Sequence, residues 1–91
     1  MKRIEELREE IRRTDQQMAE LFQKRMEVVR GVAAYKKERG LPVKDVDQEK
    51  RVLEKNLSLI GDEELKPYYL TFMQDVIDIS CRYQERLISG R

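Results

Sequence analysis

The stretch IEELREEIRRTDQQMAELFQKRMEVVRGVAAYKKER, residues 4–39, carries apolar or near-apolar residues at alternating steps of three and four. This spacing gathers them on one stripe of an α-helix. No proline interrupts the stretch, and Gly31 is its single glycine. At about 1.5 Å per residue, the predicted helix is roughly 50 Å long. We call the stripe the seam; its members are Ile4, Leu7, Ile11, Thr14, Met18, Leu21, Val28, Val32 and Tyr35.

Two cations interrupt the seam. Arg25 occupies the seam position between Leu21 and Val28, and Lys36 follows on the same side. At about 100° per residue, both lie within about 20° of the middle of the stripe. Cations on a buried face need a compensating anion. The pattern therefore predicts that a negatively charged group, from the protein or from a ligand, lies against this helix.

The long helix should end at Gly40, since glycine readily adopts the left-handed conformation that closes many helices. Lysines and an arginine occupy the last turns, where the helix dipole favours cations. Pro42 prevents the helix from continuing. Residues 41–44 are therefore predicted to be a short connector.

A second helix is predicted from about Val46 to Leu59. Either Asp45 or Asp47 can cap its N-terminus, and Asp45 with Gln48 has the spacing of a capping box. Glu49 lies on the apolar side of this helix. Gly61 is expected to close it.

A third helical element is predicted to begin with the acidic residues 62–64 and to run to about Ser89. Pro67 limits regular helix before it. Apolar residues span so wide an arc that this helix must be covered on more than one side. One stripe consists of Leu65, Tyr68, Phe72, Val76, Ile79, Tyr83 and Leu87. A second stripe lies beside it and includes two polar residues; its members are Met73, Ile77, Ser80, Gln84 and Ile88.

These elements predict an all-α fold with three helices per chain, one of them very long, in a single domain over residues 1–91. The two shorter helices can cover only part of the long one. The uncovered part of the seam predicts a second copy of the chain, and a two-fold helical-bundle homodimer is the simplest symmetric arrangement.

The composition excludes several classes of function. Charged residues make up 41% of the chain, yet the net charge is only +1, so no general field attracts nucleic acid. The chain has no histidine, which is the commonest metal ligand, and we expect neither a metal nor a cofactor. Cys81 is the lone cysteine and is expected to be an inert thiol. The absence of a membrane-length apolar run and of a signal peptide predicts a cytoplasmic protein without membrane contact.

Five polar residues are predicted to face the inside of the bundle: Arg25, Lys36, Glu49, Ser80 and Gln84. Each has an ordinary explanation. Arg25 can extend its charged end to solvent or pair with Glu49, and Lys36 can complement the C-terminus of its helix. Glu49 can be an acid of the first turn that the helix dipole favours, and Ser80 and Gln84 can hydrogen-bond within the bundle. Each buried polar group nevertheless costs free energy unless it is satisfied. A small anionic ligand would satisfy all five together.

Arg8 adds a geometric constraint. It lies at the edge of the seam, 17 residues before Arg25, and therefore about 25 Å away along the same helix. No small metabolite spans that distance. Arg8 can share a site with Arg25 only if it comes from an antiparallel partner chain.

The residues described above resemble those of the all-helical class of chorismate mutases. The resemblance covers nearly the whole chain, and its strength lies in the joint spacing of several short motifs. These are Leu7-Arg8-x-x-Ile11-x-x-x-Asp15, Leu21-x-x-x-Arg25, Lys36, Pro42-Val43-x-Asp45-x-Asp47-x-Glu49-x-x-Val52 and Ser80-x-x-x-Gln84. The family forms an intertwined helical dimer in which each active site takes one arginine from the neighbouring chain.

The resemblance implies that the substrate is chorismate, which is rearranged to prephenate in the shikimate pathway of aromatic amino acid biosynthesis. It implies that Arg8 of the partner chain and Arg25 hold the two carboxylates, with help from Ser80. Lys36 and Gln84 are implied to hydrogen-bond the ether oxygen of the substrate.

The ring hydroxyl is implied to bind Glu49 and the backbone near Asp45. One position departs from the family, because members often have arginine where this chain has Gln48. The resemblance therefore places Gln48 at the substrate but predicts a less cationic site.

Two alternatives remain open. A related helical enzyme, an isochorismate-pyruvate lyase, would use the same scaffold, although the intact segment from Asp45 to Glu49 favours the mutase. A non-catalytic coiled-coil interaction module would explain the seam. It gives no reason for Arg25, Glu49 and Gln84 to face inward together.

Overall fold

The computed structural model describes residues 3–90, and these residues form helices joined by short turns, with no strand among them. In chain order the elements are α1 (Ile4–Arg39), α2 (Val46–Ser58), the 3-10 turn η1 (Glu63–Leu65) and α3 (Lys66–Ser89). The predicted all-α fold with three helices, one of them very long, is confirmed.

Helix α1 ends at Gly40 in the left-handed conformation, as predicted. Gly40 has φ 64° and ψ 30°, in the left-handed region, where a residue without a Cβ atom avoids strain. The amide of Gly40 donates to the carbonyl of Lys37 at 3.3 Å, and the amide of Leu41 donates to the carbonyl of Lys36 at 2.9 Å. These bonds satisfy carbonyls that the helix itself leaves free, and they turn the chain toward the connector.

The start of α2 is as predicted, but its end is not. The Asp45 carboxylate accepts a hydrogen bond from the Gln48 amide at 3.1 Å, so Asp45 is the N-cap. The helix ends at Ser58, one residue earlier than expected, and Gly61 does not close it. Leu59 caps the helix in a right-handed conformation, with its amide bonded to the Asn56 carbonyl, and this ending does not require a glycine.

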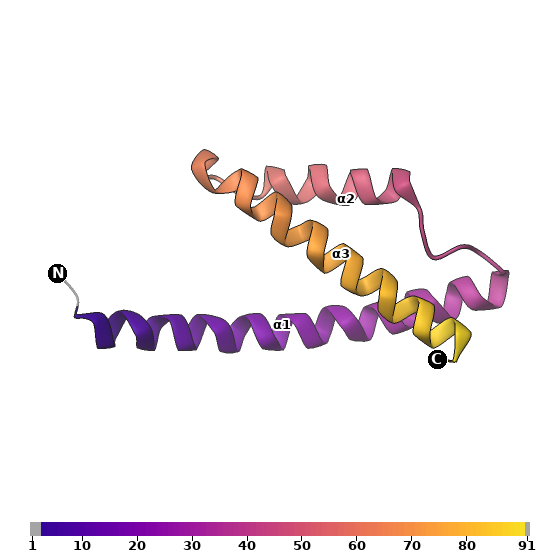
Figure 1. Cartoon of the computed structure of the whole chain (residues 1–91), viewed down its shortest axis with the longest axis horizontal. Coiled ribbons are helices and arrows are strands. Elements are labelled where there is room, and N and C mark those ends of the chain that lie inside the picture. Colours follow the sequence, from indigo (N-terminus) through magenta and orange to yellow (C-terminus); the bar gives the residue numbers. More distant parts are fainter. Residues whose placement is uncertain (1–2, 91) are drawn as a thin grey trace.

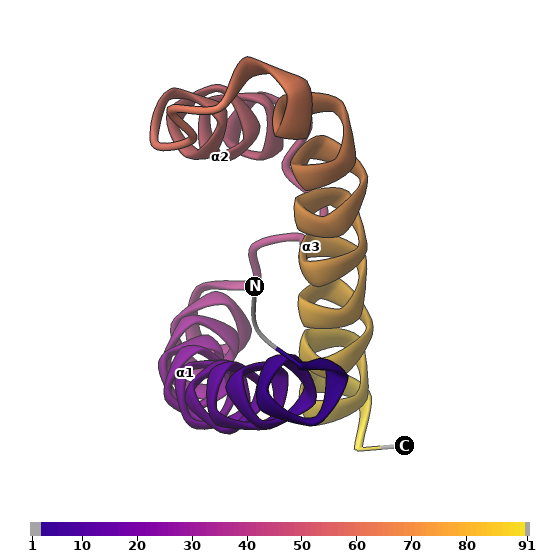
Figure 2. The same ribbon diagram turned by 90° about the vertical axis from the view of Figure 1, so that its left-hand side faces the viewer.

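The third helix joins the other two. It packs against α1 and against α2, whereas α1 and α2 do not pack on each other. Figure 1 shows α3 crossing diagonally between them. In the end-on view of Figure 2, α1 and α2 both project from the same side of α3. The Tyr69 hydroxyl ties α3 to α2 by donating to the side-chain carbonyl of Asn56 at 3.1 Å.

The seam of α1 is not the face that its own chain buries. The large apolar seam residues are all exposed, namely Ile4, Leu7, Ile11, Met18, Leu21, Val28, Val32 and Tyr35. The residues that α1 does bury are Val29 and Ala33, each one position beyond a seam residue. The diagonal crossing of α3 explains the difference, because α3 covers the flank of the stripe and leaves its centre open.

In α3, too, one apolar stripe is buried and the other is largely exposed. The second predicted stripe is the buried one, with Met73, Ile77, Ser80 and Gln84 all under a tenth exposed. Much of the first stripe faces outward, and Tyr68 and Phe72 are among its exposed members. The helix is therefore covered on one side only within a single chain.

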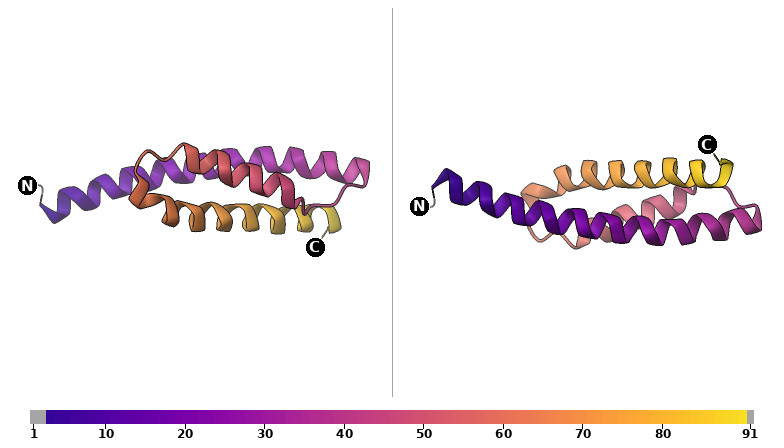
Figure 3. Two further views of the ribbon diagram at one scale, coloured as in Figure 1. Left: turned by 90° about the horizontal axis from the view of Figure 1, so that it is seen from above. Right: turned by 90° about the horizontal axis from the view of Figure 1, so that it is seen from below.

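The chain is extended and exposes more surface than a self-sufficient domain of its size. Its radius of gyration is 16.4 Å, against about 12 Å for a compact domain of this length. Its accessible surface is 7661 Å², whereas a folded monomer of this mass exposes about 5,600 Å². Figure 3 shows the first turns of α1 running past the turn between α2 and α3.

Candidate active site

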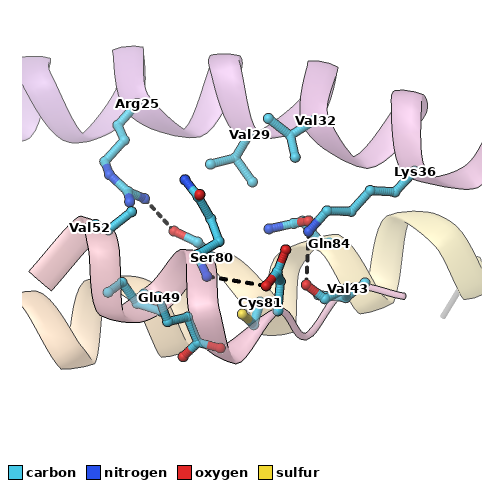
Figure 4. A pocket seen from close by; sticks show the side chains of 13 residues that line it. Arg25, Val29, Val32, Lys36, Val43, Glu49, Val52, Ser80, Cys81 and Gln84 are labelled. Carbon is cyan, nitrogen blue, oxygen red and sulfur yellow. Dashed lines mark hydrogen bonds between the residues drawn. The ribbon is translucent and has the colours of Figure 1, made fainter. Parts of the chain in front are cut away.

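A cavity of 180 Å³ lies where the three helices and the connector converge. Its polar and charged lining is Arg25, Lys36, Asp45, Gln48, Glu49, Ser80, Cys81 and Gln84, and its apolar lining is Val29, Val32, Val43, Val52 and Ile77. Figure 4 shows this pocket from close by. Of the predicted site residues, only Arg8 does not line it. The fold therefore brings all the predicted site residues other than Arg8 together around one pocket.

Arg25 is held by Ser80. Its Nη1 donates to the Ser80 Oγ at 2.5 Å. The single hydroxyl proton of Ser80 is already committed, because Oγ donates to the Val76 carbonyl at 2.8 Å. Ser80 is 5% exposed, so it acts as a buried acceptor that orients the guanidinium. Four further N–H groups of Arg25 remain for other partners.

Lys36 is held by the connector. Its Nζ donates to the Val43 carbonyl at 2.8 Å, and Val43 itself is buried. An ammonium carries three protons, so two remain for the pocket. Lys36 therefore does not simply complement the carbonyls at the end of its own helix, which was one sequence-based alternative. It bridges α1 to the segment that leads into α2.

Neither of these cations has a carboxylate partner. Within residues 3–90, no ion pair includes Arg25 or Lys36. The sequence-based alternative that Arg25 pairs with Glu49 is wrong. Two half-buried positive charges without a counter-ion, on one pocket, favour a ligand with negative charge.

Glu49 pairs with Lys44 instead. The Lys44 Nζ lies 3.0 Å from both Glu49 oxygens and donates its hydrogen bond to Oε1. The hydrogen bond to Glu49 raises the pKa of Lys44. The second oxygen, Oε2, is buried and accepts no hydrogen bond within residues 3–90. In Figure 4 the Glu49 carboxylate points away from Lys36.

Cys81 lies close enough to this pair for both charges to affect its thiol. Burial raises its pKa, and the charge of Glu49 raises it further, while Lys44 and Lys36 oppose this effect. The expectation of an inert thiol fits this environment, since a thiolate is the reactive form.

Gln84 is a buried side chain whose oxygen lacks a hydrogen-bond partner in the described part of the chain. It is 6% exposed, and its Oε1 accepts no hydrogen bond within the described residues. Gln84 and Lys36 line the same pocket (Figure 4). A buried acceptor without a donor costs about 1–3 kcal/mol. A ligand or a partner chain that donated a hydrogen bond to this oxygen would recover that cost.

Asp45 and Gln48 form the rim of the pocket. The Asp45 carboxylate is occupied as the cap of α2. The Gln48 Oε1 accepts two hydrogen bonds from Arg51, at 3.2 Å from Nε and 3.0 Å from Nη2. Sequence reasoning missed both Lys44 and Arg51. The spacing of Arg51, three residues after Gln48 on one helix, is the signal that could have identified it.

The described part of the chain offers neither a metal cluster nor a membrane helix. No group of three or more His, Cys, Asp or Glu residues within residues 3–90 is arranged to hold a metal ion. None of the described helices combines the length and the apolar character needed to cross a bilayer.

Comparison with known families identifies the family of the chain. The sequence matches the family described as Chorismate mutase type II over residues 7–85, which includes every predicted site residue from Arg8 to Gln84. The chain belongs to the type II chorismate mutase family. Family membership supports a chorismate mutase-type activity, which is an isomerase activity on chorismate. Comparisons with the curated proteins and with the solved structures gave no match.

Proposed function

We propose that this chain converts chorismate to prephenate by a [3,3] rearrangement. The observation that carries the proposal is the presence of two cations in one pocket, Arg25 and Lys36, neither of which has a carboxylate partner within residues 3–90. Chorismate carries two carboxylates and an ether oxygen that becomes more negative as its bond breaks. The family match over residues 7–85 supports the same substrate.

The reaction requires geometry and charge rather than a nucleophile or a proton shuttle. A chorismate mutase must hold the substrate folded so that the two ends of the rearranging system approach each other. Arg25, fixed by Ser80, would bind one carboxylate. It would present a planar pair of donors that restrains both position and rotation.

Stabilisation of the ether oxygen would come from Lys36 and Gln84. Lys36 is already restrained through the Val43 carbonyl, so little reorganisation is needed when negative charge develops. Gln84 lines the same pocket, and the N–H group of its amide would donate to the same oxygen. Glu49 and the backbone near Asp45 would bind the ring hydroxyl, which does not react.

The second carboxylate would be bound by Arg8 of a partner chain. Arg8 is exposed and absent from the lining of its own pocket. The 180 Å³ cavity is also smaller than the roughly 300–1,000 Å³ of most ligand sites. A two-fold dimer would bring the N-terminal part of the second α1 against the exposed seam and complete both sites.

We expect the folded protein to be a homodimer at micromolar concentration. A single chain exposes about 2,000 Å² more than a compact monomer of its mass, and stable interfaces of this kind bury a comparable area. Sedimentation velocity should give the mass of two chains. A compact, folded monomer in that experiment would contradict the proposed assembly and the shared site.

The decisive assay for the proposed activity is the loss of chorismate absorbance with prephenate as product. The same protein preparation should release no pyruvate from isochorismate, since pyruvate release would indicate the lyase alternative. A folded chain that leaves both substrates unchanged would favour the non-catalytic interaction module.

A third cation at the rim should strengthen substrate binding. Gln48 lines the pocket, so Gln48→Arg is expected to lower KM more than it raises kcat. The reason is that a carboxylate contact is present in both the ground state and the transition state. Ser58→Arg adds the same charge at the far end of α2 and serves as the control. Steady-state kinetics that show an unchanged or higher KM for Gln48→Arg would remove this position from the site.

A further inference from the structure

Among residues 3–90, the ion pair between Lys44 and Glu49 is the one that includes a residue lining the pocket, and the proposed mechanism gives Lys44 no role. The Glu49 side chain is only 14% exposed, whereas that of Lys44 is 63% exposed. The ammonium lies 3.0 Å from each carboxylate oxygen, so it spans the end of the side chain. A carboxylate that is largely withdrawn from water needs such a partner.

The connector brings the ammonium to this place. The residue before Lys44 is fixed because the Val43 carbonyl accepts from Lys36. The residue after it is fixed because Asp45 caps α2. Lys44 therefore lies between two residues that are each held by a hydrogen bond.

Other charged and titratable groups face Glu49 from the surrounding elements. Lys36 on α1 and Asp45 in the connector line the same pocket as Glu49. On α3, the charge of Glu49 raises the pKa of Cys81, and the charge of Asp78 raises the pKa of both Cys81 and Lys44. Lys44 is the only one of the cations within 4 Å of the Glu49 carboxylate in the part of the chain that the structure describes.

We propose that Lys44 is a positioning residue for substrate binding, which holds the Glu49 carboxylate in place and leaves Oε2 as the acceptor for the ring hydroxyl. The inference rests on the proposed function. A carboxylate has about four lone-pair positions, so the ammonium and a hydroxyl group can bind it together. Oε1 accepts the hydrogen bond from Lys44, whereas Oε2, although the ammonium also lies 3.0 Å from it, accepts no hydrogen bond within residues 3–90.

The kinetic test is Lys44→Met. Because the ring hydroxyl does not react, loss of a well-placed acceptor should weaken ground state and transition state alike. We expect KM for chorismate to rise about tenfold while kcat changes by less than about threefold. Lys44→Arg should restore KM, and Lys50→Met, the same change at an exposed neighbour on α2, should leave both constants unaltered.

A double-mutant cycle separates positioning from a general structural effect. If Lys44 acts through Glu49, Lys44→Met should add no further loss to the Glu49→Gln variant. Additive losses would overturn the proposal. A lower KM for Lys44→Met would also overturn it, since that result would mean that Lys44 competes with the substrate for Glu49.

Alkylation of Cys81 tests the pair without any substrate. Cys81 is the only cysteine in the chain, so the pH dependence of its reaction with iodoacetamide reports one thiol. Lys44 lowers the pKa of Cys81 and Glu49 raises it. Lys44→Met should therefore slow alkylation at mildly alkaline pH, Glu49→Gln should accelerate it, and Lys50→Met should leave it unchanged.

The two experiments distinguish the possible failures. A wild-type chain without mutase activity would overturn the proposed function and, with it, the role of Lys44. An active wild-type chain whose Lys44→Met variant has unchanged KM and an unchanged Cys81 titration would overturn the role of Lys44 alone. A raised KM, restored by Lys44→Arg, together with a slower Cys81 reaction would establish it.

Discussion

Arg8→Ala and Arg25→Ala are each expected to reduce activity by about 10²-fold or more, and a mixture of the two variants is expected to regain activity. The size of each loss is that of removing one key charged donor from a preorganised site. Arg25 lines the pocket, whereas Arg8 of the same chain is about 25 Å away along α1. Arg8 can reach a site only in a partner chain.

The recovery has a definite upper limit. In a heterodimer of the two variants, one site carries both lesions and the other carries neither. Random exchange makes about half of all dimers mixed, so the mixture should reach about a quarter of wild-type activity. Arg13→Ala, which removes a neighbouring α1 arginine that pairs with Glu9 at 3.7 Å, is the control and should remain active. Chain exchange demonstrated by mass spectrometry without recovered activity would show that Arg8 does not act across the dimer.

Helix boundaries were predictable because their causes are local. The left-handed Gly40 and the capping carboxylate of Asp45 act on backbone groups within a few residues. The end of α2 was not predictable in the same way. Gly61 has no effect there, because the chain turns at Leu59 through ordinary right-handed geometry that many residues can adopt.

The burial of the seam was only partly predictable. Periodicity identifies an apolar face but does not say which element covers it. Within one chain, α3 covers Val29 and Ala33 and leaves the seam exposed, which depends on the angle at which α3 crosses α1. That angle follows from the packing of all three helices.

The residues that line the pocket were more predictable than the hydrogen bonds and ion pairs that these residues form. Helical spacing places Ser80 and Gln84 on one face of α3, and both line the cavity. The partner of Glu49 depends instead on the path of the connector, which brings Lys44 nearer than Arg25. Likewise, the bond from Ser80 to Val76 leaves Ser80 as an acceptor for Arg25, a role that residue type alone does not specify.

Replacement of Gln84 by glutamate should convert a pH-independent reaction into one that requires acid. An amide donates a hydrogen bond at any ordinary pH, whereas a carboxyl group donates only when it is protonated. The chain has no histidine, so wild-type kcat should be nearly flat from about pH 5 to about pH 8.5 while the dimer remains folded. Gln84→Glu should be most active at low pH and should lose activity as the new carboxyl ionises.

The midpoint of that loss reflects two opposing effects. The site at Gln84 is buried, which raises the pKa of a carboxyl group placed there, while the nearby charge of Lys36 lowers it. Ionisation would also place negative charge beside the ether oxygen at the moment when that oxygen becomes negative, so the loss should fall on kcat. Measuring kcat against pH for both proteins, with circular dichroism at each pH, separates this effect from unfolding. A Gln84→Glu variant equally active at about pH 5 and about pH 8 would show that Gln84 does not donate to the ether oxygen.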